Sequence, residues 1–404
     1  MKKYALLSLA LSCTLYAGGY KIPEVSTSGV ALSAANVAHA HGADTAYYNP
    51  ANMVFMEDSN SIEADLIYIG LDSVTYKGSV GNDPTLYNIS SETEDFFIPS
   101  LNYVSPKLGE RGARVGLSIV VPGGLSKRWP DSPGKDTAEE FTLEIVEVNP
   151  TVAIPVTDKL AFAFGLRAVM TSGVVKSSAA ISRDMTGDTI DVGYNLALSY
   201  KPTEKLEFGA TYRSKVNLTV EGNAKLYSPT GLAYDGGANV TVPLPAFATL
   251  AAAYTFDTDT TVEFVYERTM WSSYKTLDFD YVGNIGNLVP FDAPLERNWH
   301  DTDTFRVGLT QELKGMTFMA GFVIDESPVP NKTIGFELPG SDSMSFSLGG
   351  RYQLNEKIDL GLSALYSIHD ARTISEADEN DNGIVGEFSD GNVLIVSVGL
   401  GYKF

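Results

Sequence analysis

Four arginines stand in segments of alternating hydrophobicity, on the side that otherwise carries small residues. They are Arg167, Arg213, Arg306 and Arg351. A guanidinium group can hold a carboxylate through two parallel hydrogen bonds, so each arginine is a candidate for binding an acidic ligand. Each could also pair with an Asp or Glu of the same chain, or with the amino-terminal segment. The sequence leaves both roles open for all four.

His39 and His41 have the spacing of a pair of metal ligands. A metal site needs three or four ligands, and no matching cluster of His, Asp or Glu is evident in the sequence. We therefore expect structural roles for both histidines and no metal site. We expect no cofactor either.

Residues 378–383, which read DENDNG, resemble the start of a calcium-binding loop. The twelfth position of such a loop holds a bidentate Glu, but here that position is Ser389. An acidic loop over residues 376–390 is the simpler interpretation, and whether it binds calcium stays open.

A hydrolase would need a nucleophile, a base and an acid close together. His369 and Asp370 are adjacent, but no serine is placed to complete a triad with them. No other cluster of this kind is evident in the sequence. We therefore expect that the chain is not an enzyme.

Residues 1–17 have the pattern of a signal peptide. Lys2 and Lys3 give a positive start, and the apolar run over residues 4–16 is too short to span a bilayer as a helix. Cys13, the single cysteine, lies in this leader, and a lipoprotein acylated there is the alternative interpretation. Without Cys13 the mature chain has no thiol, which excludes disulfides and cysteine chemistry.

The chain is strongly acidic. It carries 29 Lys and Arg against 50 Asp and Glu, a formal net charge of −21, and two of those lysines belong to the leader. Nucleic acids are recognised by basic surfaces, so this charge argues against a nucleic-acid partner. After the leader no run reaches 18 apolar residues, and we therefore expect no transmembrane helix.

Residues 18–57 are rich in Ala, Gly and Ser and have no clear helical or strand period. A segment of this composition cannot build a hydrophobic core of its own. It needs walls around it. We expect the rest of the chain to supply them, with residues 18–57 as a hatch inside.

Residues 58–404 repeat one pattern, a run of alternating hydrophobicity followed by a turn, which is typical of β-strands. The connections between runs alternate between short and long, as in outer-membrane barrels with an even number of strands. The fold class expected is therefore all-β, a transmembrane antiparallel β-barrel. The fourteen candidate strands are residues 60–71, 95–105, 112–121, 141–156, 159–174, 190–201, 205–222, 239–256, 259–276, 302–313, 315–325, 341–354, 356–370 and 389–404.

The end of the chain fits this interpretation. Alternate residues from Leu394 to Phe404 are apolar, and Tyr402 and Phe404 would lie in the aromatic girdle at the membrane interface. A terminal aromatic residue on such a strand also resembles the signal that barrel-assembly machinery reads. We expect a monomer in the outer membrane of a Gram-negative bacterium, in contact with its lipid and lipopolysaccharide.

Short motifs along the chain resemble those of the long-chain fatty acid transporters of bacterial outer membranes, the FadL type. The resemblance covers nearly the whole mature chain. Its motifs are Ser28-Gly29-Val30-Ala31-Leu32, Asn49-Pro50-Ala51, Pro122-Gly123-Gly124-Leu125, Asn149-Pro150, Leu244-Pro245, Trp271-Ser272 with Tyr274, Asn298-Trp299-His300-Asp301-Thr302, Asp325-Glu326-Ser327-Pro328-Val329-Pro330 and Gly401-Tyr402-Lys403-Phe404.

This resemblance implies a fourteen-stranded barrel with the hatch in its lumen, and uptake of hydrophobic compounds such as long-chain fatty acids or hydrocarbons without ATP. It places the amino end of the hatch, Gly18, Gly19 and Tyr20, near the substrate. Asn49, Pro50 and Ala51 would anchor the far end of the hatch to the wall. Apolar residues of the long loops, such as Trp129 and Phe291, could form a capture groove or simply pack the loops.

The resemblance also implies a lateral gap where the third strand kinks inward. Our candidates for this kink are Gly116, Pro122, Gly123 and Gly124, because glycine weakens a strand and proline cannot donate to its ladder. Many members carry an aromatic residue before Gly-Leu where this chain has Pro-Gly-Gly-Leu. The alternative is that Pro122 merely begins a loop.

A porin for small hydrophilic solutes is the alternative function. A porin has an open polar lumen, whereas residues 18–57 would block this one. The sequence therefore favours a passive channel for hydrophobic compounds, and it does not name the compound.

Overall fold

The computed structural model describes residues 19–286 and 288–404. The predicted signal peptide and Gly18 lie outside them. Seventeen strands form one sheet. They are β1 (Ser61–Leu71), β4 (Glu94–Val104), β5 (Arg114–Lys127), β6 (Glu140–Thr157), β7 (Leu160–Ser178), β8 (Ser182–Tyr200), β9 (Leu206–Arg213), β10 (Val216–Ser228), β11 (Gly231–Leu244), β12 (Phe247–Thr255), β13 (Thr260–Thr269), β15 (Phe279–Tyr281), β17 (Thr302–Leu313), β18 (Met316–Asp325), β19 (Ser343–Gln353), β20 (Ile358–His369) and β23 (Val393–Lys403).

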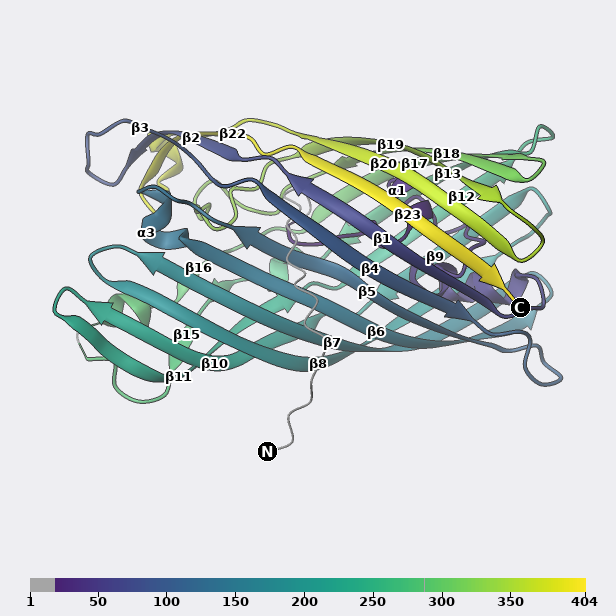
Figure 1. Ribbon diagram of the computed structural model, residues 1–404, viewed down its shortest axis with the longest axis horizontal. Coiled ribbons are helices and arrows are strands. Elements are labelled where there is room, and N and C mark those ends of the chain that lie inside the picture. The colour runs from purple at the N-terminus through teal and green to yellow at the C-terminus, as the bar shows by residue number, and fades with distance from the viewer. Residues whose placement is uncertain (1–18, 287) are drawn as a thin grey trace.

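The sheet closes on itself because β1 pairs with β4 on one side and with β23, the last strand, on the other. All pairings between neighbours are antiparallel, and the ring has fourteen strand positions. Figure 1 shows the ring as a barrel of tilted strands. Closure leaves no unpaired outer edge, which is what a sheet in lipid requires. The predicted fold class is confirmed.

Seventeen strands fill fourteen positions because three positions are interrupted along their length. The predicted strand over residues 205–222 breaks between β9 and β10. At the break, the Ser214 hydroxyl oxygen accepts a hydrogen bond from the Tyr194 amide at 2.9 Å, in place of a backbone carbonyl. The predicted strand over 239–256 breaks at Pro245, which has no N–H to donate. The predicted strand over 259–276 ends at Thr269 and gives way to a 3₁₀ helix, η2 (Trp271–Ser273).

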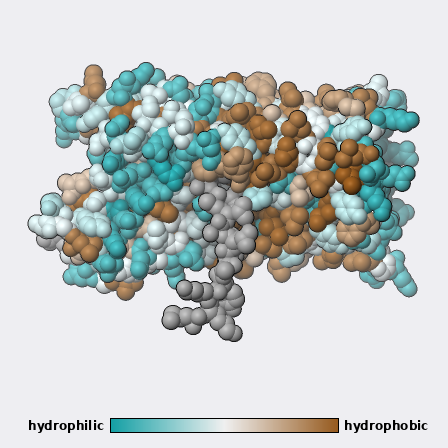
Figure 2. Space-filling model, viewed as in Figure 1, coloured by the Kyte–Doolittle hydropathy of each residue, from teal (hydrophilic) through white to brown (hydrophobic). Residues whose placement is uncertain are grey.

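An apolar belt covers the outside of the barrel wall. Outward side chains such as Val192, Leu250, Phe264 and Leu362 are more than half exposed. Figure 2 shows apolar side chains gathered in the part of the visible face nearer the chain end, while hydrophilic ones cover the part that carries the long loops. None of the described helices is long and apolar enough to cross a membrane.

The hatch lies inside this ring, where Figure 1 shows it as the purple segment. It contains α1 (Thr27–Ala31), α2 (Thr45–Tyr48) and a 3₁₀ helix, η1 (Pro50–Phe55). Its small residues matter because its backbone touches the wall. A Cβ on Gly321 of β18 would lie 2.3 Å from the Leu32 carbonyl carbon, so only glycine fits there.

The long connections carry structure of their own. Four short strands form a sheet beyond the barrel rim, namely β2 (Val74–Val80), β3 (Tyr87–Ser90), β21 (Arg372–Ile374) and β22 (Ile384–Asp390). The remaining short elements are α3 (Gly134–Ala138), β14 (Thr276–Leu277), β16 (Leu295–Glu296), η3 (Val289–Phe291) and η4 (Glu376–Asp378). Trp129 is fully buried under this cap and donates to the Phe336 carbonyl at 2.8 Å, so it packs the loops.

The acidic loop predicted over residues 376–390 is part of this cap. The Asp378 carboxylate caps η4 by accepting from the Ser375 amide at 2.7 Å and from its hydroxyl at 2.8 Å. These hydrogen bonds hold the pKa of Asp378 below its usual range. Asp381 lies 3.7 Å from Lys332. Both carboxylates therefore have partners within the protein.

Candidate functional site

A largely apolar cavity, of about 830 Å³ with its opening to solvent included, lies between the tip of the hatch, the inner face of the wall and the outer loops. Its walls come from strands on one side of the barrel and from loops near η2 and β14. The residues that line it include Leu125, Phe141, Leu143, Val175, Met185, Val220, Val240, Val242, Leu277, Phe279, Val329 and Leu338. This apolar lining suits an apolar ligand.

Tyr20 of the hatch forms one wall of this cavity. Its ring packs edge-on against Trp271 with centroids 4.8 Å apart, and its hydroxyl donates to the Pro243 carbonyl. Gly19 has φ +71°, and a Cβ there would lie 2.5 Å from the Trp271 ring. Only glycine can take that conformation in that space. Of the predicted amino-end residues that the structure describes, Tyr20 lines the cavity and Gly19 supports the Trp271 ring beside it.

One ion pair lines the apolar cavity. Arg297 Nη1 lies 2.7 Å from Glu337 Oε1, and both side chains are mostly buried. Burial disfavours the charged form of Arg297, but Glu337 and Tyr274 outweigh that effect and raise the pKa of Arg297. The sequence prediction missed Arg297, which lies in a long loop without periodicity. Its position directly before the quoted Asn298-Trp299 motif was the available signal.

The four arginines singled out from the sequence lie elsewhere, and each has a carboxylate partner. Arg167 Nε lies 2.8 Å from Glu147 Oε2, and Arg213 contacts the other oxygen of Glu147. None of the four is among the described residues that line the 830 Å³ cavity. A role in binding a ligand's carboxylate therefore stays a prediction, and it would require each arginine to exchange its present partner.

The other two arginines touch the hatch or its partners. Arg306 lies 3.4 Å from Glu267, which also holds Lys21 of the hatch at 2.5 Å. Arg351 contacts Glu63 at 2.6 Å and Asp359 at 2.5 Å, and its Nη1 lies 3.3 Å from the Ser28 hydroxyl of α1.

The far end of the hatch is tied to the wall at Asn49. Its side-chain amide donates to the Val37 carbonyl at 2.9 Å and to the Leu198 carbonyl of β8 at 3.3 Å. Its oxygen accepts from the Ala51 amide at 3.1 Å, and Pro50 begins η1. Asn49 therefore joins two parts of the hatch and one wall strand.

The third wall strand, β5, leaves its neighbour β4 midway. The two strands pair only where residues 101–104 face residues 116–119. Beyond that point β5 stays with β6, but its register shifts between Val120 and Gly123. The outer part of β4 keeps its pairing with β1 alone, so the ladder between β4 and β5 is interrupted.

The hatch takes the hydrogen bonds that β4 gives up. Ile22 donates to the Pro122 carbonyl at 2.9 Å, and Gly124 donates to the Tyr20 carbonyl at 2.9 Å. A Cβ on Gly123 would lie 2.7 Å from the Tyr20 carbonyl oxygen. Pro122, Gly123 and Gly124 thus lie at the interruption, whereas Gly116 lies in the paired part of β5. Pro122 does not begin a loop, because β5 continues to Lys127.

A second cavity of about 1030 Å³ adjoins the first among the outer loops. The two share Phe141, Leu277, Phe279, Arg297 and Glu337. Phe291 and Leu295 line only the outer one. The ion pair of Arg297 and Glu337 therefore stands at the junction between this second cavity, which we call the loop groove, and the apolar cavity.

A closed antiparallel barrel with an apolar belt, an internal hatch and an apolar cavity above the hatch tip defines the class of this protein. It is a plugged outer-membrane β-barrel. The chain belongs to the outer membrane protein transport protein family (OMPP1/FadL/TodX), whose family model matches residues 8–404.

Individual relatives agree with this assignment. The long-chain fatty acid transport protein of Escherichia coli O6:H1 is 22% identical over 406 residues, which cover 88% of each chain. Outer membrane protein P1 of Haemophilus influenzae is 23% identical and covers 90% of each chain.

Solved structures show the same fold. A Pseudomonas aeruginosa FadL homologue superposes with a TM-score of 0.83 at 20% identity, covering 96% of this chain and all of its own. The Pseudomonas putida toluene transporter TodX superposes with a TM-score of 0.75 at 17% identity, covering 95% of this chain and 99% of its own.

Proposed function

We propose that this chain carries hydrophobic small molecules passively across the outer membrane, through a barrel plugged by its own amino-terminal segment. The observation that carries the proposal is the apolar cavity beside Tyr20, in a lumen otherwise lined largely by polar and charged groups. Relatives of this chain are named for transport of long-chain fatty acids and of toluene, which are both largely apolar.

A substrate would enter through the loop groove and pass Arg297 and Glu337 into the cavity. The shared lining of the two spaces supports this route. Arg297 lines the cavity and could bind the carboxylate of a fatty acid, but Glu337 already neutralises its charge. A neutral hydrocarbon would need no such exchange, so the cavity as it stands favours neutral substrates.

Tyr20 would act as the gate below the cavity. It is held by ring contacts, by one hydroxyl hydrogen bond and by backbone bonds to β5, and its displacement would open the cavity toward the interrupted wall. Since the hatch tip and β5 share hydrogen bonds, a movement of the tip would change the position of β5 and the reverse.

The substrate would leave sideways, between β4 and β5. Exposure of apolar surface to water costs about 25 cal/mol per Å², so exit into the bilayer is favoured over exit into the aqueous periplasm. The interrupted ladder at residues 120–127 of β5 is the feature that supports this route.

The role involves no covalent chemistry, and we propose that the chain is not an enzyme. We also propose that it acts as a monomer in contact with lipopolysaccharide. Assembly by the barrel-assembly machinery would use the terminal strand β23, whose Tyr402 and Phe404 rings stack with centroids 5.4 Å apart.

Filling the cavity tests the proposed function. Leu277→Trp places a larger side chain at a buried position of the cavity wall, while Leu250→Trp makes the same change on the lipid-facing side of β12. Cells with equal surface levels of each variant should take up labelled toluene slowly with Leu277→Trp and normally with Leu250→Trp. Equal uptake by both would reject the cavity as the route.

The porin alternative is tested separately in planar bilayers. A plugged channel should give small, irregular conductance, because residues of the hatch fill the lumen. Large, steady, ohmic pores from the purified protein would favour the porin.

A further inference from the structure

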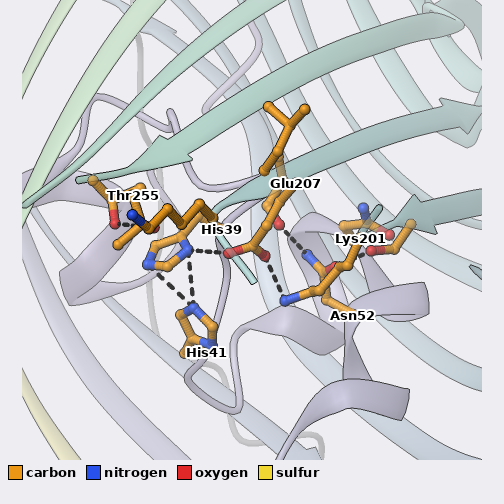
Figure 3. Close-up of polar contacts among 12 residues, drawn as sticks. His39, His41, Asn52, Lys201, Glu207 and Thr255 are labelled. Atoms are coloured by element: carbon orange, nitrogen blue, oxygen red, sulfur yellow. Dashed lines mark hydrogen bonds and ion pairs between the residues drawn. The ribbon is translucent and has the colours of Figure 1, made fainter. Parts of the chain in front are cut away.

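Two histidines of the hatch and one carboxylate of the wall meet near the end of the barrel that carries the short turns. His39 and His41 come from the connection between α1 and α2, and Glu207 comes from β9. His39 Nδ1 lies 2.6 Å from Glu207 Oε1, and His41 Nε2 lies 3.1 Å from His39 Nδ1. Figure 3 shows His39 between His41 and Glu207. One ligand atom from each of the three lies within 4.8 Å of the others.

Two imidazoles and a carboxylate are a donor set that binds Zn²⁺, with a fourth position left to water. The sequence prediction expected no metal because no third ligand was evident. Glu207 lies 168 positions from His39 along the chain, so the pattern of spacing could not pair them. The closed barrel brings them together.

The backbone around His39 is fixed before any metal arrives. The Glu263 carboxylate of β13 accepts from the amides of Val37, Ala38 and His39 at 2.8, 2.7 and 3.1 Å. Asn52 donates to the Val37 carbonyl at 2.9 Å. This arrangement holds His39 against the wall, whereas His41 is exposed and can adjust to complete a coordination sphere.

A cation can reach this place through an open cavity at the end of the barrel that carries the short turns. His39 and His41 line a polar cavity of about 1110 Å³, which also includes Gly315 and Lys357 from short turns between strands. Its lining includes five carboxylates, those of Asp44, Glu63, Glu312, Glu356 and Asp359, against three cations, Arg351, Lys357 and Lys403, so its charge is negative on balance. Clefts rich in one sign of charge concentrate ions of the opposite sign.

Lys201 limits how tightly a cation could be held. Its Nζ contacts the second oxygen of Glu207, on the side away from His39 (Figure 3). This contact leaves Oε1 directed toward the histidines, but the positive charge of Lys201 opposes a metal ion. We expect an affinity below that of structural zinc sites.

We propose that His39, His41 and Glu207 bind one Zn²⁺ ion, which clamps the hatch to the wall at β9. Because the ligands come from both parts, the complete site exists only when the hatch is seated. Binding therefore stabilises the seated hatch by linkage. The proposal concerns the hatch and its wall, and it does not depend on which substrate the upper cavity takes.

Zinc titration of tag-free, metal-stripped protein in detergent tests the site. Calorimetry should give one ion per barrel. His41→Ala and Glu207→Gln should each weaken binding at least about tenfold, as loss of a ligand does, whereas His300→Ala, a control at an exposed loop histidine, should leave it unchanged. Heat-modifiable migration on gels shows that each variant is folded. Absence of saturable binding, or equal affinity in His41→Ala and His300→Ala, would overturn the site.

Hydrogen exchange tests the clamp in the same samples. Zinc should slow exchange of the amides over residues 36–44 in the wild-type protein and in His300→Ala, but not in His41→Ala. Stoichiometric binding that leaves this exchange unchanged would overturn the clamp. Substrate is absent from both measurements, so failure of the transport proposal and failure of this one are distinguishable.

Discussion

The tip of the hatch and the body of the hatch are held by different forces. Around Gly19 and Tyr20 the contacts are ring packing, one hydroxyl and a few backbone hydrogen bonds to β5, and the charged contacts begin with the next residue, where Lys21 pairs with Glu267. Around α1 and α2 the contacts are buried charges, such as Glu263 with its three amides and Asp65 accepting from the Thr27 amide at 3.0 Å. Contacts of the first kind can be exchanged for contacts with an apolar substrate. Breaking those of the second kind leaves a buried charge unsatisfied.

This difference assigns separate roles to the two parts. A gate must move at little cost, and the tip meets that requirement. A plug must stay in place. The body is held by buried charges, and leaving such a charge without its partner has a large free-energy cost. We therefore expect substrate to displace the tip while the body stays seated.

The largest effect should come from Glu147, which pairs with both Arg167 and Arg213 in the middle of the lumen. Glu147→Ala would leave two buried guanidinium groups without their partner, a loss of about 3–5 kcal/mol. The variant should lose its heat-modifiable gel mobility at a much lower temperature than the wild type. Glu204→Ala, in an exposed turn, is the control, and equal melting of the two variants would refute the role of buried charge.

The next effect concerns the hatch body alone. Glu263→Ala leaves three amides of residues 37–39 unpaired, and each unsatisfied buried donor costs about 1–3 kcal/mol. The barrel should persist, but hydrogen exchange over residues 36–44 should quicken strongly and conductance in planar bilayers should rise. Glu110→Ala, at an exposed position of the turn between β4 and β5, should change neither quantity. Unchanged exchange in Glu263→Ala would remove the distinction between body and tip.

The alternation of residue types predicts the wall well and its interior contacts poorly. The alternation in β20 shows which face meets lipid, because lipid requires apolar side chains and the close approach of the hatch requires small ones. Leu360 and Leu362 lie on the lipid side, and Gly361 and Ser363 lie on the lumen side. Parity says that Arg213 faces inward, but it does not say that Glu147, 66 positions away, will meet it. Arg297 lies in a loop without a period, so no parity argument reaches it.

The sequence carries a local signal for only some of the strand interruptions. Pro122 and Gly123 pointed to a break in the third strand because their chemistry weakens a ladder. The break at Ser214 has no such signal, since its side chain merely substitutes for a backbone acceptor that Tyr194 would otherwise find. A break can be predicted from the sequence when the residues at the break cause it. It cannot be predicted when an ordinary side chain takes over the hydrogen bond that the backbone loses.

A third effect concerns the join between tip and wall. Gly123→Val would drive a side chain into the Tyr20 carbonyl, which lies 2.7 Å from the position of a Cβ. The tip must then shift or β5 must move back toward β4, and uptake of labelled hydrocarbon should fall markedly at equal surface levels. Ala64→Val on the lipid face of β1 is the matched control. Wild-type uptake by Gly123→Val would remove the assignment of the exit to this glycine.

The smallest and most specific effect concerns the ion pair at the cavity entrance. Glu337→Gln keeps the shape of the side chain but removes the charge that neutralises Arg297. Hydrogen bonds to charged groups contribute about 1.5–3 kcal/mol, so a fatty acid should bind the variant at least about tenfold more tightly. Toluene carries no charge and should bind both proteins equally.

Fluorescence of Trp299, which lines the cavity, reports both ligands, and Glu379→Gln in the exposed acidic loop is the control. A gain for the fatty acid alone would identify Arg297 as the group that reads a carboxylate and Glu337 as the reason the native cavity favours neutral compounds. Equal affinities for the fatty acid in the two variants would mean that the pair only braces the loops, and the substrate preference would then have to lie in the shape of the cavity.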